Sequence, residues 1–372
     1  MIFKNANVFF QGHFQTIDVE IQQDQIVKIA SNLSGEEQCD LSGKMLIPGL
    51  IDVHTHGCIG FDFSTASVEE LKQMREYYQQ QGVTTVAATT MTEELGLYRQ
   101  AVKNIRQTME TEKSGCRIAG INMEGPFLSK AKKGAHDEKY LYPVDFELFE
   151  ELDQLSGGNI RIVDLDPELE HAIEFIKTYH TNKTCSIAHT PCGYETAMKA
   201  VEAGAGQVTH LYNAMNGLHH REPGVVGAMF DSNLLGELIC DGIHIHPSVI
   251  RLSFKAFGER IVIVSDTMCA CGLQDGNYLL GGQQVKVTGK KACLDDGTIA
   301  GSVTNVYRGL VNVISFGIPK EQAILAATLN PAKSLKLDDQ LGSIDVGKKA
   351  DLLVIDSDWN LLNVYQGGKL VK

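Results

Sequence analysis

Several features that mark particular classes of protein are scarce in this sequence. The 9 cysteines are odd in number and scattered over 372 residues, and no Cys-x-x-Cys pair occurs, so we expect reduced thiols rather than a disulfide framework. No run approaches the roughly 18 apolar residues of a membrane span, and the N-terminus has neither a basic segment nor a long apolar one. These absences predict a soluble, cytoplasmic protein that has no membrane as a partner.

Positive charge is also in short supply. Lys and Arg number 33 against 46 Asp and Glu, which gives a net charge of -13 and a pI of about 5.4. This balance argues against nucleic acid or an anionic membrane surface as a partner. An acidic protein that binds an anionic small molecule needs a local cluster of positive groups.

Strand and helix patterns alternate through the middle of the chain, whereas both ends have short strands only. Strand candidates lie at 50–56, 83–91, 117–124, 160–166, 184–189, 207–211, 236–241 and 261–266. Helical periodicity follows most of them, for example at about 68–80 and 168–180, with only a short connection at 224–230 in the sixth unit. Such alternation predicts a (β/α)₈ TIM barrel, placed at 49–340, with a small β insertion at about 272–302. The segments 1–48 and 341–372 are predicted to form one small β-sandwich domain from both chain termini.

Two histidines one residue apart end the first strand candidate. Side chains two apart on a strand point to the same face, so His54 and His56 can present both imidazoles to one point. Imidazole is the commonest protein ligand for metals. The pair alone is also explained by two polar residues at a strand end.

Further histidines and carboxylates end other predicted strands, where a barrel of this kind carries its chemistry. They are Glu124, His189, His210 and Asp266. Each alone has a structural explanation, such as a core histidine or a turn cap, but together with the first pair they predict a metal site. Nitrogen and oxygen ligands suit Zn²⁺, Fe²⁺, Mn²⁺ or Co²⁺. The number of ligands allows either one ion or two adjacent ions that Glu124 bridges. Since a metal-bound water becomes hydroxide near neutral pH, and Asp266 is placed to act as general base and acid, this pattern predicts hydrolysis.

Several motifs carry a resemblance to a known family. Segments 47–57 (Ile-Pro-Gly-Leu-Ile-Asp-Val-His-Thr-His-Gly) and 347–354 (Gly-Lys-Lys-Ala-Asp-Leu-Leu-Val) are similar to the amidohydrolase superfamily. Within it, the chain resembles the N-acetylglucosamine-6-phosphate deacetylase family at 122–127 (Asn-Met-Glu-Gly-Pro-Phe), 133–136 (Lys-Gly-Ala-His), 209–215 (Thr-His-Leu-Tyr-Asn-Ala-Met), 221–224 (Arg-Glu-Pro-Gly), 241–244 (Asp-Gly-Ile-His) and 300–302 (Ala-Gly-Ser). The resemblance spans nearly the whole chain.

The resemblance implies an activity and a set of roles. The activity is removal of the acetyl group from N-acetylglucosamine 6-phosphate to give glucosamine 6-phosphate and acetate, in amino-sugar catabolism and recycling. Glu124, His189 and His210 would bind metal, with His54 and His56 available for a second ion, and Asp266 would be the catalytic acid and base.

The same resemblance implies the residues that contact the sugar phosphate. His136, beside Ala135, would polarise the acetamide carbonyl. Other substrate contacts would come from Asn213, Ala214, Arg221, His244, Ile299, Ala300 and Gly301. Arg221 belongs to the densest basic cluster of the predicted rim, where a guanidinium suits phosphate. In the family its counterpart reaches the neighbouring subunit's site, which implies a homodimer.

Alternatives and departures remain open at this point. A galactosamine-6-phosphate deacetylase would share the metal site, and a cyclic-amide hydrolase would need a carboxylated lysine where this chain offers Glu124. A non-catalytic barrel that binds a sugar phosphate would not need Asp266. The chain has Thr267 where the family usually has alanine, and Asp166 where it usually has alanine.

Overall fold

Eight parallel strands pair side by side in chain order in the computed structural model, which describes residues 1–111 and 113–372. They are β8 (Leu50–Thr55), β11 (Val83–Thr90), β12 (Arg117–Glu124), β13 (Ile160–Leu165), β14 (Thr184–Ile187), β15 (Gln207–Val208), β16 (Leu235–Ile239) and β17 (Ile261–Val264). The last strand meets the first just beyond its own end: the backbone N–H of Asp266 donates to His54 O at 2.9 Å, and that of His56 to Thr267 O at 2.8 Å. The predicted TIM barrel is confirmed.

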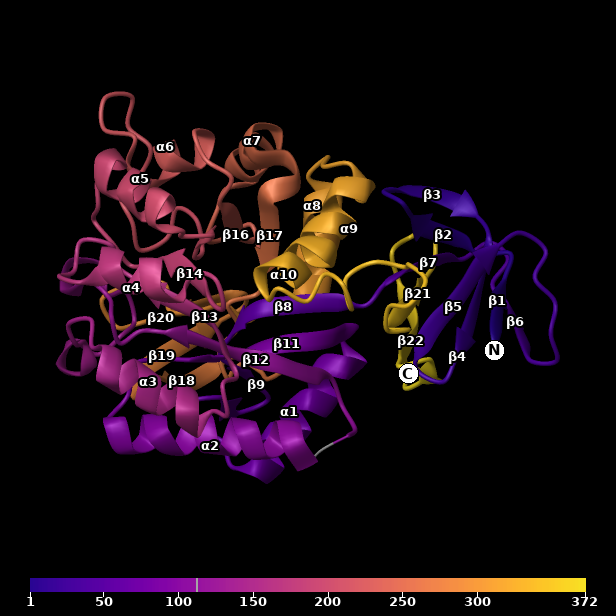
Figure 1. Ribbon diagram of the computed structural model, residues 1–372, viewed down its shortest axis with the longest axis horizontal. Helices are drawn as coiled ribbons and strands as arrows, with labels where there is room; N and C mark the ends of the chain where they lie inside the picture. The colour runs from indigo at the N-terminus through magenta and orange to yellow at the C-terminus, as the bar shows by residue number, and fades with distance from the viewer. Residues whose placement is uncertain (112) are drawn as a thin grey trace.

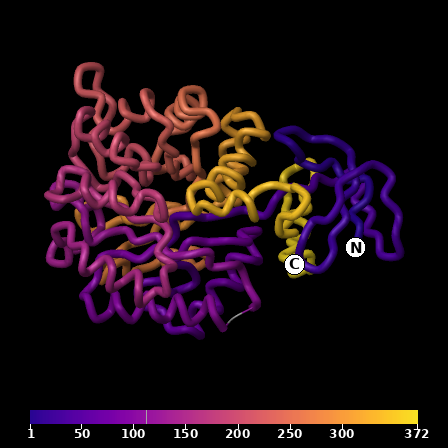
Figure 2. Tube along the Cα trace, viewed as in Figure 1, coloured from indigo at the N-terminus to yellow at the C-terminus, as the bar shows by residue number. Residues whose placement is uncertain are grey.

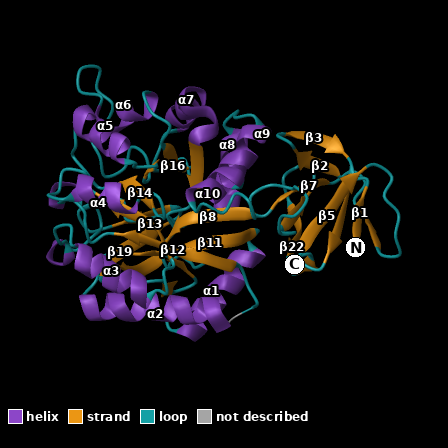
Figure 3. Cartoon of the chain, in the orientation of Figure 1, coloured by secondary structure: helices purple, strands orange, loops and turns teal. Residues whose placement is uncertain are grey.

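Helices surround these strands, as Figure 3 shows. They are α1 (Val68–Gln80), α2 (Leu95–Thr111), α3 (Phe146–Leu155), α4 (Ala172–Tyr179), α5 (Tyr194–Ala203), α6 (Gly224–Phe230), α7 (Pro247–Phe257), α8 (Val306–Ser315), α9 (Lys320–Ala327) and α10 (Leu329–Ser334). Short 3₁₀ turns occur at η1 (Lys130–Lys132), η2 (Glu138–Tyr140) and η3 (Gly258–Arg260). No helix in the described part of the chain has both the length and the apolar character needed to cross a membrane.

Both chain ends form a separate β-sandwich beside the barrel (Figure 1). One sheet has the order β5-β4-β1-β6 and the other β23-β22-β21-β7-β2-β3. The strands are β1 (Ile2–Lys4), β2 (Asn7–Phe10), β3 (His13–Thr16), β4 (Asp18–Gln22), β5 (Gln25–Ala30), β6 (Gln38–Asp40), β7 (Met45–Pro48), β21 (Leu352–Ile355), β22 (Leu361–Gln366) and β23 (Lys369–Leu370). The two ends are joined where β7 pairs antiparallel with β21, and Figure 2 shows the indigo and yellow segments together. Apolar side chains such as Phe3, Val19 and Leu352 are fully buried in this sandwich.

Two small sheets cover the carboxyl-terminal end of the barrel. One consists of β9 (Gly57–Cys58) and β10 (Phe61–Asp62). The other is a meander of β18 (Gly276–Leu280), β19 (Gln283–Thr288) and β20 (Lys291–Cys293), which follows the last barrel strand. Leu280 and Ala300 of this region pack with Met91 and Ala135 from the loops after earlier strands. The meander therefore forms one wall above the end of the barrel where the predicted site lies.

Candidate active site

One carboxylate, Glu124 at the end of β12, lies among the imidazoles of several strand ends. Its Oε1 is 3.1 Å from Nε2 of His189 and 3.1 Å from Nε2 of His210. Its Oε2 is 3.3 Å from Nε2 of His56, and its Oε1 is 3.4 Å from Nε2 of His54. Glu124 is 2% exposed, so these contacts are made away from water. The residues that sequence placed at four separate strand ends converge on one point.

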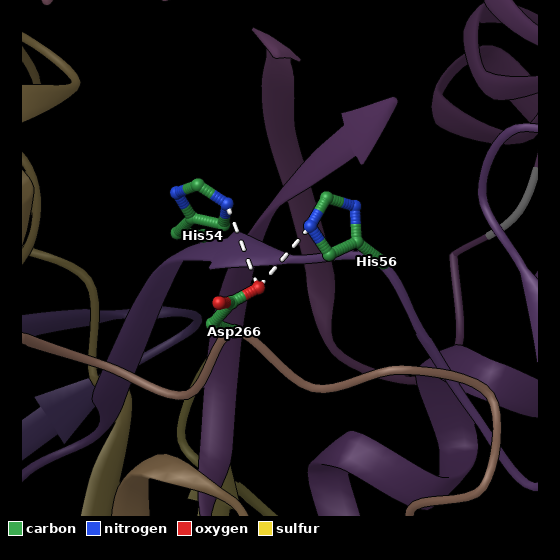
Figure 4. A group of neighbouring side chains, drawn as sticks. All are labelled: His54, His56 and Asp266. Atoms are coloured by element: carbon green, nitrogen blue, oxygen red, sulfur yellow. Dashed lines mark ion pairs between the residues drawn. The ribbon is translucent and has the colours of Figure 1, made fainter. Parts of the chain in front are cut away.

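Asp266 faces the histidine pair at the end of β8 from the other side of the barrel seam. Its Oδ1 lies 3.2 Å from Nε2 of His56 and 3.8 Å from Nε2 of His54. Figure 4 shows both rings turned toward this one carboxylate oxygen. His54 and His56 thus contact both carboxylates, which places Asp266 beside the group around Glu124.

Three site residues adopt a backbone conformation that non-glycine residues rarely adopt. His189, His210 and Asp266 have φ values of 42°, 27° and 49°. Each lies two residues beyond the end of its strand, β14, β15 or β17, so the chain turns there and each side chain reaches the cluster around Glu124. Left-handed non-glycine residues cost free energy and cluster at functional sites, because surrounding structure must hold them.

A buried glutamate that the sequence prediction did not name holds two of these histidines. Glu237 Oε2, in the middle of β16, lies 2.9 Å from Nδ1 of His54 and accepts the backbone N–H of His210 at 3.1 Å. Its Oε1 accepts from Gln207 at 2.7 Å. A carboxylate on Nδ1 leaves Nε2 of His54 as the nitrogen that faces the site, which is how metal-binding histidines are usually oriented. A charged residue in the middle of a buried strand is the signal that could have revealed it.

Burial and neighbouring charges move the pKa values of the site in different directions. Burial lowers the pKa of His189 to about 4, despite its hydrogen bond to Glu124, so its imidazole is neutral at pH 7. Burial alone would raise the pKa of Glu124, but the charge of His54 and the hydrogen bonds from His136 and His189 hold it well below its usual range. The pKa of Asp266 is likewise lowered to about 2, because the hydrogen bond from His56 and the charge of His54 outweigh burial. Both carboxylates are therefore ionised near neutral pH.

The donor set fits a divalent cation. Nε2 of His54 is buried and has no hydrogen-bond partner in the described part of the chain, and Nε2 of His189 and of His210 are only 3.0 Å apart. Three candidate ligand groups meet at this point: His54, His56 and Asp266 form one, Glu124, His136 and His189 form another, and His54, Glu124 and Asp164 form a third that shares a residue with each. Convergent imidazole nitrogens around ionised carboxylates are the ligands that Zn²⁺, Fe²⁺, Mn²⁺ and Co²⁺ bind.

His136 also presents Nε2 to this centre, but its Nδ1 has a different hydrogen-bond partner from that of His54. The backbone N–H of Thr92 donates to its Nδ1 at 3.4 Å, and Thr92 Oγ1 lies 2.9 Å from the same nitrogen. Nδ1 is thus the acceptor, and the ring proton is on Nε2, which lies 3.3 Å from Glu124 Oε2. A ring held in this tautomer presents a hydrogen-bond donor to the site.

A cavity of about 550 Å³ opens above the cluster and brings together most of the predicted site residues. Those that line it are His56, Glu124, Ala135, His136, His189, His210, Asn213, Ala214, His244, Asp266, Ile299 and Gly301. His244 is fixed by Asp241, whose Oδ2 lies 2.7 Å from its Nδ1.

Three predicted residues do not line this cavity. His54 is 0% exposed and lies beneath it, and Ala300 is buried in the wall, where its N–H donates to Ala292 O. Arg221 lies in an exposed loop outside the cavity, with Nη1 2.7 Å from His220 Nε2. Within one chain, therefore, Arg221 does not line the cavity above the Glu124 cluster.

Comparison with known proteins places this geometry in a family. A sequence profile of the Amidohydrolase family matches residues 45–371. The chain belongs to the amidohydrolase family. Among related amidohydrolases, N-acetylglucosamine-6-phosphate deacetylase of Bacillus subtilis (strain 168) is 40% identical over 325 residues, 86% of this chain and 82% of the relative. N-acetylgalactosamine-6-phosphate deacetylase of Escherichia coli O157:H7 is 33% identical over 330 residues, 88% of each chain.

A solved amidohydrolase structure agrees in fold. The crystal structure of N-acetylglucosamine-6-phosphate deacetylase from Pasteurella multocida superposes with a TM-score of 0.94, at 30% identity, over 99% of this chain and 98% of that one. The resemblance to this deacetylase family, expected from the motifs, is confirmed.

Proposed function

We propose that this amidohydrolase removes the acetyl group of N-acetylglucosamine 6-phosphate, giving glucosamine 6-phosphate and acetate. The observation that carries the proposal is the Glu124-centred cluster with Asp266 beside it, open to a cavity of about 550 Å³, in a chain 40% identical to an N-acetylglucosamine-6-phosphate deacetylase. The reaction belongs to amino-sugar catabolism, and the cytoplasm is the proposed location.

Each side chain has a proposed task in the amide hydrolysis. Glu124, His189 and His210 would hold one divalent ion, and His54 and His56 with Glu124 a second. When bound, such an ion lowers the pKa of water and polarises a carbonyl. Asp266 would accept the proton of the attacking water and return it to the departing amine. His136, with its proton on Nε2, would donate to the acetamide oxygen as negative charge develops there.

The remaining predicted residues would bind the sugar phosphate. Asn213, Ala214 and His244 line the cavity and are proposed to contact its polar groups. Ile299 and Gly301 line the wall on the meander side and would contact the sugar or the acetyl group, with Ala300 behind them. Arg221 is proposed to act on the site of a second subunit, because in its own chain it lies outside the cavity. A homodimer is therefore part of the proposal.

The test is release of free amine from N-acetylglucosamine 6-phosphate by protein stripped of metal and reconstituted in parallel with Zn²⁺, Fe²⁺, Mn²⁺ or Co²⁺. Turnover restored by a metal supports both the reaction and the cofactor. The metal content at full activity distinguishes one ion from two. Absence of turnover with every metal would contradict the proposal.

A second substrate is favoured by one observation. An N-acetylgalactosamine-6-phosphate deacetylase is 33% identical over 88% of this chain, and such an enzyme would share the metal centre and differ in its contacts to the sugar O4. The same assay with N-acetylgalactosamine 6-phosphate compares kcat/KM for the two sugars. A higher kcat/KM for the galactosamine substrate would reassign the enzyme to it.

A further inference from the structure

Asp164 is a buried acid of the barrel interior to which the proposed reaction gives no task. It lies on β13, one residue before the strand ends, and pairs in register with Glu124 of β12. Side chains of register partners on neighbouring strands point to the same face of a sheet, so Asp164 faces the barrel interior as Glu124 does. The side chain is 0% exposed. A carboxyl group buried to this extent needs partners that offset its loss of water.

Only one of the two carboxyl oxygens of Asp164 has such a partner. Thr209 Oγ1 donates to Oδ1 at 2.8 Å, whereas Oδ2 is buried and has no hydrogen-bond partner among the described residues. Nε2 of His54 is also buried and unpartnered in this part of the chain, because Glu237 holds the ring through Nδ1. Buried polar atoms of native proteins are almost always satisfied, so two unpartnered atoms in one region indicate a shared ligand.

Asp164 and His54 meet Glu124 closely enough to bind one ion together. The ligand atoms that these three residues offer all lie within 4.8 Å of one another, and Nε2 of His54 is 3.4 Å from Oε1 of Glu124. One imidazole nitrogen with two carboxylate oxygens is a donor set that divalent transition metals accept. Asp164 does not line the cavity, so this donor set reaches the metal centre from inside the barrel.

The charges around Asp164 also favour a cation at this position. Burial and the charge of Glu237 raise the pKa of Asp164 well above its ordinary value, and the charge of Glu124 acts in the same direction. The charge of His54 opposes this rise only in part. A divalent cation between Asp164 and Glu124 would favour both ionised carboxylates and offset the repulsion between them.

We propose that Asp164 is a further ligand of the metal centre and binds, through Oδ2, the ion that His54 and Glu124 hold. This inference rests on the proposed function, because it adds a ligand from β13 to the ion-binding residues named there. The ion would then be held from inside the barrel by an anionic group that a substrate in the cavity does not reach. Loss of this carboxylate should therefore weaken ion binding even when no substrate is present.

The experiment titrates Co²⁺ into metal-stripped protein without substrate, followed by calorimetry and visible absorbance. Asp164→Asn keeps the size of the side chain and removes its negative charge. We expect the affinity for one ion to fall by more than about 100-fold, beyond the range of 10–100-fold that loss of a partner of a metal-bound histidine costs. The Co²⁺ absorbance should also change, because one ligand has changed. Thr209→Val is the matched control, since it removes the hydrogen bond to Oδ1 and keeps the carboxylate, and its Co²⁺ affinity should stay within a few-fold.

A smaller loss of affinity in Asp164→Asn, an equal loss in the two variants, or no Co²⁺ binding by the wild type would overturn the proposal. In the first two cases Asp164 acts through hydrogen bonding or packing rather than as a ligand.

A crystal structure of the Co²⁺-loaded wild type decides the question if Asp164→Asn does not fold. Anomalous scattering locates the ion, and Oδ2 of Asp164 is expected at about 2.0–2.2 Å from it, the usual distance of a carboxylate ligand. An ion out of direct contact with Asp164 would reject the assignment. Neither measurement depends on turnover, so a protein that binds Co²⁺ through Asp164 and does not release amine contradicts the proposed function alone.

Discussion

At the scale of single residues, Asp266 makes the most direct prediction. Its Oδ1 lies 3.2 Å from His56 Nε2, and its side chain lines the cavity. Asp266→Asn keeps size and shape but cannot take a proton, so kcat should fall by about 10²–10⁴, the usual contribution of a general acid or base. Metal content and the affinity for glucosamine 6-phosphate should be retained.

Metal analysis of this variant separates two roles for the carboxylate. If Asp266→Asn loses a metal ion, the carboxylate of Asp266 is needed to bind that metal. If it keeps both its metal and near-wild-type turnover, Asp266 is not the acid or base. Only loss of turnover with metal retained agrees with the proposal.

Glu237 makes a second prediction at this scale. One oxygen accepts from both the ring of His54 and the backbone of His210, and the glutamate is fully buried. In Glu237→Gln, the side-chain amide would face these two donors in one of two ways. Its NH₂ group cannot accept their hydrogen bonds, and its oxygen accepts them without a negative charge. We expect the affinity for the more weakly bound ion to fall about 10–100-fold, as for other partners of metal-bound histidines.

A Co²⁺ titration followed by absorbance measures this affinity without reference to turnover. Gln207→Met is the matched control, because it removes the hydrogen bond to the other oxygen of Glu237 and touches neither histidine. It should lower the melting temperature and leave Co²⁺ affinity within a few-fold. Equal loss of affinity in the two variants would mean that Glu237 acts only through general packing.

These residues also show how far the site can be predicted from sequence. His54, His56, Glu124 and Asp266 could be found because each ends an apolar run, and parallel strands bring their ends together. Glu237 could not be placed in this way, because its partners His54 and His210 lie on β8 and just after β15, 183 and 27 residues away in the chain. Long-range pairing of this kind depends on barrel closure, which strand periodicity does not encode.

At the scale of elements, the helix boundaries followed their local signals. α1 begins after Ser67, which forms a capping box with Glu70, and the predicted range 68–80 is confirmed. The predicted helix 168–180 instead begins at Ala172. Asp166 is the reason: its carboxylate accepts the N–H of Glu168 at 2.9 Å and holds a turn where the helix was expected to start.

Thr267 also has a structural account at this scale. Its Oγ1 donates to Gly57 O at 2.8 Å and lies 2.8 Å from Thr55 Oγ1, so it joins the segment after β17 to β8. The departure from the family pattern therefore adds a hydrogen bond across the seam where the barrel closes. Sequence alone could not identify its partner, because β8 is more than 200 residues away.

The terminal sandwich yields a prediction about acid stability. Asp18 of β4 is 4% exposed and accepts from Lys4 Nζ at 2.6 Å and from the backbone N–H groups of Asn5 and Leu33. Burial alone would raise the pKa of Asp18, but the hydrogen bonds from Lys4 and these N–H groups lower it below its ordinary value. A carboxyl group whose pKa is lowered on folding stabilises the protein above its unfolded pKa, and this stability is lost as pH falls through the folded pKa.

Asp18→Ala should therefore lower the free energy of unfolding at pH 7 by about 2–3 kcal/mol, since it leaves buried donors without an acceptor. Denaturant unfolding of both proteins between about pH 7 and pH 3 measures the difference. The two stabilities should converge toward the acid end of this range. A difference that stays constant with pH would show that packing, and not the ionised carboxylate, is responsible.

At the scale of the whole molecule, the chain ends meet beside the barrel and leave its carboxyl-terminal face free. β7 and β21 join the termini in one sheet, on the side of the barrel shown at the right of Figure 1. The loop with Arg221 is exposed and lies outside its own cavity. We therefore expect a homodimer by light scattering, in which this loop contacts the neighbouring subunit.

Mixing two impaired variants, Arg221→Ala and Asp266→Asn, tests whether Arg221 acts on the other subunit. In Arg221→Ala dimers every site lacks the guanidinium, and KM for the phosphorylated sugar should rise by about 10–100-fold. In Asp266→Asn dimers every site lacks the acid and base. A hybrid dimer has one site that combines an intact Asp266 with the Arg221 of the other subunit, so exchange of subunits should restore low-KM turnover in up to half of the sites of each hybrid. If Arg221 instead acts within its own chain, every site of the hybrid carries one of the two defects, and mixing will leave the kinetics equal to the sum of the separate variants.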